Sequence, residues 1–185
     1  MIYQLNLQVT QVLTGAALLI THLLAFSAVP KLAESLPKFP RSRTLGILLL
    51  TIAGGWTFWL MNTMDLGEFS SKRSLLVMLV PIAYVLTIFF VEEFLAVRAL
   101  GMVALLAACL LLDAAFLHDH LARIPLVALA YGWIVAGLFL VGKPYLLRDA
   151  ISWLTAVPKR LSAACAGGVL YGILLIVLAV VFLKS

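Results

Sequence analysis

The sequence contains few charged residues. Only 11% of its 185 residues are Asp, Glu, Lys or Arg, whereas 64% are hydrophobic and the mean hydropathy is +1.15. A water-soluble protein of this size would have too little polar surface to cover such a core. The composition therefore excludes an ordinary soluble domain and predicts a protein whose solvent is the lipid bilayer.

Cysteine is almost absent as well. Cys109 and Cys165 are the two cysteines, and both lie inside apolar runs without C-x-x-C or Cys/His spacing. The sequence thus predicts neither a disulfide framework nor a thiolate metal site. Residues 1–11 contain no Lys or Arg and so lack the positive region of a signal peptide. We therefore expect the first apolar segment to remain in the protein.

Long charge-poor runs dominate what is present. Each is about 17–25 residues long, the length that a helix needs to cross the hydrocarbon core. The sequence predicts an all-α fold, a polytopic transmembrane helical bundle in a single integral membrane domain of residues 1–185. Six spans are expected at about residues 11–30, 44–64, 74–91, 99–117, 124–142 and 161–183.

The basic residues lie at the ends of these spans and form no patch or stripe, which argues against nucleic-acid binding despite the formal net charge of +5. With the N-terminus outside, nine of the thirteen Lys and Arg residues fall in inner loops. The positive-inside rule therefore predicts that both termini face outside. The inner residues are Lys31, Lys38, Arg41, Arg43, Arg98, Lys143, Arg148, Lys159 and Arg160, and the outer ones are Lys72, Arg73, Arg123 and Lys184.

Two of the inner loops are predicted to be amphipathic connectors. On a helical projection, residues 145–157 divide into an apolar arc that includes Ile151 and a polar arc that includes Arg148. Such a helix lies in the plane of the membrane interface. Residues 30–43 have a similar character, and residues 92–101 form a tighter connection on the same side. We expect three inward-pointing hairpins, formed by spans 1 and 2, 3 and 4, and 5 and 6.

The last of these hairpins carries a family resemblance. A spanning helix, a proline, an amphipathic piece ending in LTAVPKR and a small-residue helix containing AGGVLYGILLIVL follow one another over roughly residues 126–184. This arrangement resembles the small two-helix inner-membrane proteins of the YjeT type. That family has no known function, so the resemblance implies a bacterial inner membrane and no particular chemistry.

Ionisable side chains inside the spans are candidate functional residues, because placing one at the bilayer centre costs at least about 2.5 kcal/mol. His22 lies in the first span, where it is either a haem ligand or proton relay, or a neutral histidine bonded to a neighbouring helix. The structural role is favoured, because no second histidine lies at its depth. Asp113 lies a turn inside the boundary and is expected to pair with Arg123 or a hydroxyl group.

Glu92, Glu93 and Arg98 form a third candidate cluster, in which opposite charges across a tight turn offset part of each other's desolvation. An alternative is an intramembrane protease of the CAAX-processing type, whose pattern resembles E-E-x-x-x-R followed by F-x-x-x-H. We expect no such active site. An unbroken helix from about Arg98 to Leu117 separates the glutamates from His120 by roughly 30 Å.

His118, Asp119 and His120 have the chemistry of metal ligands. On a continuous helix, however, His118 and His120 point about 200° apart and do not face one ion. A weak metal or pH-sensing site would require the turn after Leu117 to unwind, and a wetted loop is favoured. We predict no metal site and no catalytic residue, and the sequence leaves any cofactor open.

Small residues recur every four positions in the last span, at Ala164, Gly168 and Gly172. They are expected to form a shallow groove that a neighbouring helix can approach closely. This groove and the shortage of intramembrane polar groups favour a non-catalytic scaffold or accessory subunit, in contact with lipid and with a membrane protein partner or a second copy. The alternative is a small transporter or membrane-embedded enzyme that uses His22, Asp113 or the cluster of Glu92, Glu93 and Arg98.

Overall fold

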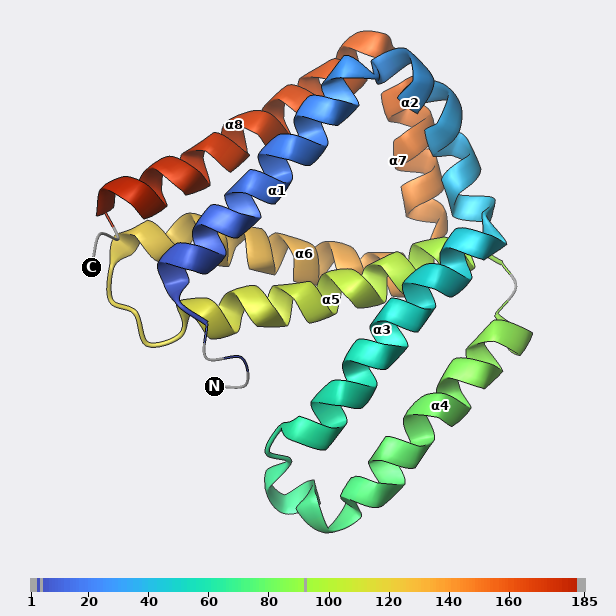
Figure 1. Cartoon of the computed structure of the whole chain (residues 1–185). Coiled ribbons are helices and arrows are strands. Elements are labelled where there is room, and N and C mark those ends of the chain that lie inside the picture. The colour runs from blue at the N-terminus through green and yellow to red at the C-terminus, as the bar shows by residue number, and fades with distance from the viewer. Residues whose placement is uncertain (1–2, 4, 92, 183–185) are drawn as a thin grey trace.

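The computed structural model describes residues 3, 5–91 and 93–182, and every regular element within these ranges is helical. The predicted all-α fold is therefore confirmed. Six helices are long and apolar enough to cross a membrane, in agreement with the six predicted spans. They are α1 (Leu7–Ser27), α3 (Arg43–Thr63), α4 (Arg73–Phe90), α5 (Leu95–Ala115), α6 (Ile124–Gly142) and α8 (Pro158–Phe182) (Figure 1).

The shorter helices lie at the two ends of the bundle. At one end, which we name the connector face, the spans are joined by α2 (Val29–Ser35), the 3-10 helix η1 (Leu36–Arg41) and α7 (Tyr145–Thr155). At the opposite end, the loop face, they are joined by η2 (Gly67–Lys72) and η3 (Leu121–Arg123). The start of α1 and the end of α8 also lie at the loop face (Figure 1).

Polar residues cap the starts of two spans. The Asn6 side chain accepts the backbone N–H groups of Gln8 and Val9 at the start of α1, and Ser42 accepts that of Leu45 at the start of α3. Caps of this kind stabilise a helix by about 1 kcal/mol. The first span therefore begins at Leu7, a full turn before the predicted boundary, because Asn6 and not the apolar run defines its end.

The packed helix pairs differ from the predicted hairpins. α1 packs along α8, α5 packs along α6, and α3 packs along both α5 and α4. In the described part of the chain, none of the predicted pairs (α1 with α3, α4 with α5, α6 with α8) is among the main contacts. The three predicted hairpins describe the order of the spans along the chain and not which spans pack together. The connectors hold α1 and α3, and α6 and α8, apart (Figure 1). α1 packs on the distant α8, whereas α3 packs on α4, and α5 on α6, which are the next spans along the chain.

Two of these pairs cross at paired glycines. A Cβ atom on Gly15 would lie 2.8 Å from the carbonyl oxygen of Gly172, and one on Gly172 would lie 2.7 Å from that of Gly15. Likewise, Cβ atoms on Gly101 and Gly137 would lie 2.8 and 2.9 Å from each other's carbonyl oxygens. The backbones approach this closely only because neither side carries a side chain. Such close packing holds spans together in lipid, where the hydrophobic effect does not drive helices to associate.

α5 is the central helix of the molecule. One cluster of buried residues joins α5 to α1, α6 and α8 around Leu7, Leu126 and Leu175. A second cluster joins α5 to α3 around Leu50 and Leu95. α4 contains no buried residue within Arg73–Phe90, and only its half-buried Tyr84 and Ile88 pack against the second cluster.

α7 has the two faces that its sequence predicts. Ile151 is buried and Leu147 is half-buried against the bundle, whereas Arg148 and Asp149 are exposed and form an ion pair of 2.8 Å. Trp153 is exposed, and the guanidinium group of Arg160 lies 4.4 Å from its ring centroid. An exposed tryptophan beside a cation is typical of a helix at the membrane interface.

Candidate functional site

The His22 ring packs against Gly168 of α8, where the helix carries no side chain. Its Nδ1 lies 2.8 Å from the carbonyl oxygen of Leu18, one turn back in α1, so Nδ1 carries the proton and donates it. The ring lies so close to Gly168 that any side chain at that position would overlap it. These contacts favour the structural interpretation of His22.

The small-residue groove of the last span is filled by the protein's own α1. Gly172 faces Gly15 and Leu19, and Gly168 faces His22. Ala164 is exposed and lies outside this contact. The groove at Gly168 and Gly172 is therefore an internal packing surface, and α1 occupies the place that a partner helix would take there.

Arg98 makes a different contact from the one that the sequence predicts. Its Nη1 donates to the carbonyl oxygen of Val141 at 2.7 Å, at the end of α6, while its Nε is buried without a partner among the described residues. Glu93 is exposed, and Glu92 lies outside the described residues. Within the described ranges the one ion pair is that of Arg148 and Asp149, so Arg98 and Glu93 do not compensate each other.

Three further arginines close the C-terminal ends of helices in the same way. The last carbonyl groups of a helix have no intrahelical donor, and the helix dipole favours a positive charge beside them. The basic residues that indicate orientation in the sequence thus also satisfy helix ends. The donors and their carbonyl acceptors are Arg73 to Asn62 and Met64, Arg123 to Ala115, and Arg160 to Trp153.

Asp113 anchors the N-terminal segment to α5. Its Oδ2 accepts the backbone N–H of Tyr3 at 2.9 Å, a partner that the sequence analysis does not name. The Tyr3 phenol oxygen accepts the indole N–H of Trp56 at 2.6 Å, and the Tyr3 ring centroid lies 5.7 Å from that of Trp59. Tyr3 therefore bridges α5 and α3 on the side of the loop face, a contact that sequence reasoning missed.

The environment of Tyr3 keeps its phenol protonated. Burial raises the pKa of the Tyr3 phenol above its ordinary value of 10.0, and the hydrogen bond from Trp56 opposes this shift. Cys109 and Asp113 raise the pKa further, because each is negatively charged when ionised. The Tyr3 side chain therefore bridges α3 and α5 as a neutral phenol.

The histidines at the loop face do not converge. α5 ends at Ala115, two residues before the predicted boundary, and the chain turns at Leu117, which has a φ of +59°. Nδ1 of His120 accepts the backbone N–H of Ala122, and His118 and Asp119 are exposed. Among the described residues, no three His, Cys, Asp or Glu side chains gather at one point. The unbroken α5 also keeps Glu93 and His120 at opposite ends of the bundle.

Gln11 is a buried polar residue that does not ionise, so it is not among the ionisable candidates from the sequence. It is 0% exposed, and its amide donates to the carbonyl oxygens of Ala122 at 3.1 Å and Leu175 at 3.3 Å. Its Oε1 has no partner among the described residues. Gln11 ties α1 to α8 and η3. The signal for it in the sequence is a glutamine at the first position of a predicted span.

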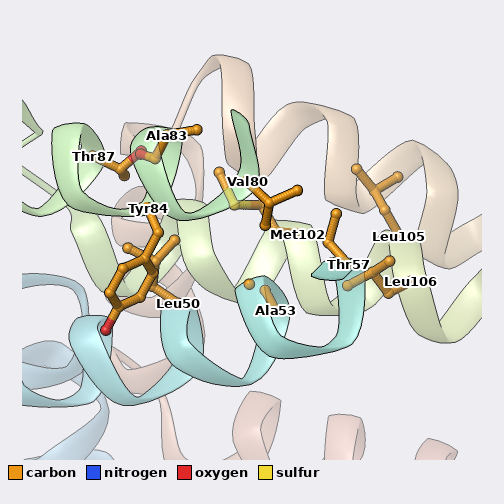
Figure 2. Close-up of a pocket in the computed structure, with 11 residues that line it drawn as sticks. Leu50, Ala53, Thr57, Val80, Ala83, Tyr84, Thr87, Met102, Leu105 and Leu106 are labelled. Carbon is orange, nitrogen blue, oxygen red and sulfur yellow. The ribbon is translucent and has the colours of Figure 1, made fainter. Parts of the chain in front are cut away.

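A cleft between α3, α4 and α5 is the clearest candidate binding site (Figure 2). Its volume is about 320 Å³, at the lower end of the range for ligand pockets. Alkyl side chains form most of its wall, and no lining residue is charged. We name it the α3–α4–α5 cleft; Leu50, Ala53, Gly54, Thr57, Val80, Ala83, Tyr84, Thr87, Met102, Leu105 and Leu106 line it.

The hydroxyl groups of this cleft are mostly engaged within the protein. The Tyr84 hydroxyl lies 2.8 Å from that of Thr51, and the Thr87 hydroxyl donates to the carbonyl oxygen of Ala83. Thr57 makes no side-chain hydrogen bond within the described residues. A site with one available hydroxyl and apolar walls suits binding of an apolar group and offers no general acid, base or nucleophile pair.

Comparison with known proteins finds no matching family model, no matching curated protein and no matching solved structure. The fold and its contacts define the class of the protein: an all-α protein with six helices suited to cross a membrane. The resemblance of residues 126–184 to the YjeT type stays a prediction.

Proposed function

We propose that this protein is a non-catalytic scaffold or accessory subunit of a complex in the bacterial inner membrane. The observation that carries the proposal is the exposure of α4. This helix is long enough to cross a membrane, contains no buried residue, and has α3 as the one span that it mainly packs against. Some polar side chains of the described spans join helices to one another, as Gln11 and Arg98 do, and others bond back to a carbonyl group of their own helix, as Thr21 and Thr87 do. This arrangement supports assembly better than chemistry.

The exposed face of α4 is the surface that we assign to the partner. Leu79 and Leu86 are 46% and 50% exposed and lie seven residues apart, which places them on one face. We expect a photoreactive amino acid at Leu79 or Leu86 to form a covalent adduct with a partner protein or a second copy in native membranes. The same label at Leu170 of α8, which is 67% exposed, is the matched control.

Mass measurement in mild detergent completes this test. A defined complex that the double variant Leu79→Ala, Leu86→Ala dissociates supports the proposal, provided that Leu170→Ala leaves the complex intact. A lone monomer, together with equal and nonspecific labelling at all three positions, contradicts it.

The same proposal places the connector face in the cytoplasm, because most of the basic residues lie there. In a variant without Cys109 and Cys165, single cysteines at Ser70 and Asp119 are expected to react with a membrane-impermeant maleimide from the periplasm. A single cysteine at Ser42 is expected to be protected. Labelling of Ser42 to the same extent as Ser70 would refute this orientation.

A further inference from the structure

Beyond each end of the α3–α4–α5 cleft, α3 and α5 are joined to each other. Towards the connector face, α3 meets α5 where a Cβ on Gly46 would lie 2.8 Å from the backbone nitrogen of Ala96. Towards the loop face, Tyr3 bridges Trp56 of α3 and Asp113 of α5. A ligand that reaches the cleft therefore comes from the side, where α4 leaves α5 largely uncovered.

The cleft accepts a chain better than it accepts another helix. Close helix packing needs an open surface of small residues, and Ala53 and Gly54 would supply one. The ring of Tyr84 covers it, because a Cβ on Gly54 would lie 3.3 Å from Cδ2 of Tyr84. A second backbone is thus kept away from α3 at this level, while Val80 of α4 and Met102 of α5 line the apolar space that remains (Figure 2).

Thr57 fixes the depth at which a ligand can form a hydrogen bond. It lies six residues before the end of α3 at Thr63, which is about 9 Å along the axis at about 1.5 Å per residue. Trp56 and Trp59 lie at the same level, where aromatic side chains mark the membrane interface. A lipid ester carbonyl lies just below that interface, and its acyl chain extends from there towards the bilayer centre.

From these observations we infer that the α3–α4–α5 cleft is a binding site for one acyl chain of a phospholipid from the leaflet at the loop face. The Thr57 hydroxyl donates to the ester carbonyl oxygen, and the chain lies against Val80, Ala83 and Met102. On α4 the site uses Val80, Tyr84 and Thr87, with Ala83 at the border to the face of Leu79 and Leu86, and it requires no partner protein at that face.

A photoreactive lipid tests the site. The protein is reconstituted in vesicles that contain a phosphatidylcholine with a diazirine in the middle of one acyl chain, irradiated, and mapped by proteolysis and mass spectrometry. We expect adducts concentrated on the lining segments 80–87 and 102–106 relative to the lipid-exposed helix α8. Adducts distributed in proportion to exposure over all spans would overturn the inference, because they indicate ordinary boundary lipid.

Two substitutions separate the site from general lipid contact. Ala83→Phe fills the cleft from an exposed position of α4 and is expected to lower cleft labelling about tenfold, equivalent to about 1.4 kcal/mol. Ala163→Phe on the exposed surface of α8 is the matched control and is expected to leave cleft labelling unchanged. Equal labelling in both variants, with both proteins folded by circular dichroism, overturns the inference.

The hydrogen bond has its own control within the cleft. Thr57→Val is expected to lower cleft labelling about three- to tenfold, equivalent to about 0.7–1.4 kcal/mol, which is the effect of losing one net hydrogen bond. Thr87→Val removes a hydroxyl that already bonds to Ala83 and is expected to have little effect. A diazirine fatty acid without the ester is the competing probe, and stronger cleft labelling by it than by the phospholipid would refute the assignment of the ester carbonyl.

Discussion

Two parts of this molecule hold their helices together by different means. In the four-helix half, made of α1, α5, α6 and α8, two pairs of spans cross backbone to backbone at Gly15 with Gly172 and at Gly101 with Gly137. In the α3–α4 arm, α4 has no glycine and no buried residue, and it lies on α3 through larger side chains. Helices of similar length and apolarity therefore differ in packing because small residues, not hydropathy, decide how closely two spans approach in lipid.

The comparison predicts its largest effect at the glycine crossing. Gly15→Leu would push a side chain into the Gly172 carbonyl and is expected to lower the free energy of unfolding by about 3 kcal/mol. Unfolding by sodium dodecyl sulfate in mixed micelles, followed by circular dichroism, measures this change. Gly167→Leu, where nothing lies within 4 Å of a Cβ, is the control. Equal losses in the two variants would show that the crossing has no special role.

Large-to-small substitutions test the same difference in packing between the four-helix half and the α3–α4 arm. Leu126 is 0% exposed in the four-helix half, and Leu126→Ala is expected to cost about 2 kcal/mol, because the neighbouring side chains lose their van der Waals contacts. Leu79→Ala on α4 is expected to change the free energy of unfolding by less than about 0.5 kcal/mol. The same micelle titration measures both, and a larger cost on α4 would reverse the comparison.

A buried amide gives a smaller effect. Gln11→Leu removes the hydrogen bonds from α1 to Ala122 and Leu175, which lowers the stability of the protein. The net loss is expected to be only about 1 kcal/mol, because the substitution also removes the buried, unpartnered Oε1. The thermal unfolding midpoint in mild detergent measures the loss. Thr21→Val, which removes a hydroxyl that bonds within α1, is the control. A stabilised Gln11→Leu protein would mean that the orphaned oxygen outweighs both bonds.

The smallest effect is a coupling free energy. Arg98 donates to the α6 terminus and Glu93 is exposed, so Arg98→Gln is expected to destabilise the protein while Glu93→Gln has little effect. In a double-mutant cycle the two changes are expected to add to within about 0.5 kcal/mol. A larger coupling free energy would indicate that Arg98 and Glu93 form the ion pair that the sequence suggests. Arg98→Gln with Arg148→Gln provides a reference pair from separate contacts.

The partners of the polar residues show where sequence reasoning ended. The depth of His22 and Asp113 in their spans was predictable, because depth follows from position along a helix. Their partners were not: His22 faces Gly168 of the last span, and Asp113 bonds to Tyr3 near the start of the chain. Both contacts join segments more than a hundred residues apart, and nothing local in the sequence encodes them.

The six spans, their all-α character and the amphipathic α7 follow from the amino-acid sequence, because helix length, apolarity and amphipathic faces are properties of neighbouring residues. Which spans pair, why the groove at Gly168 and Gly172 is already filled, and where the α3–α4–α5 cleft lies become visible only in the folded protein. The physical reason is that all six spans are comparably apolar in a solvent that is equally apolar. Pairing therefore depends on the shapes of surfaces that meet only after folding.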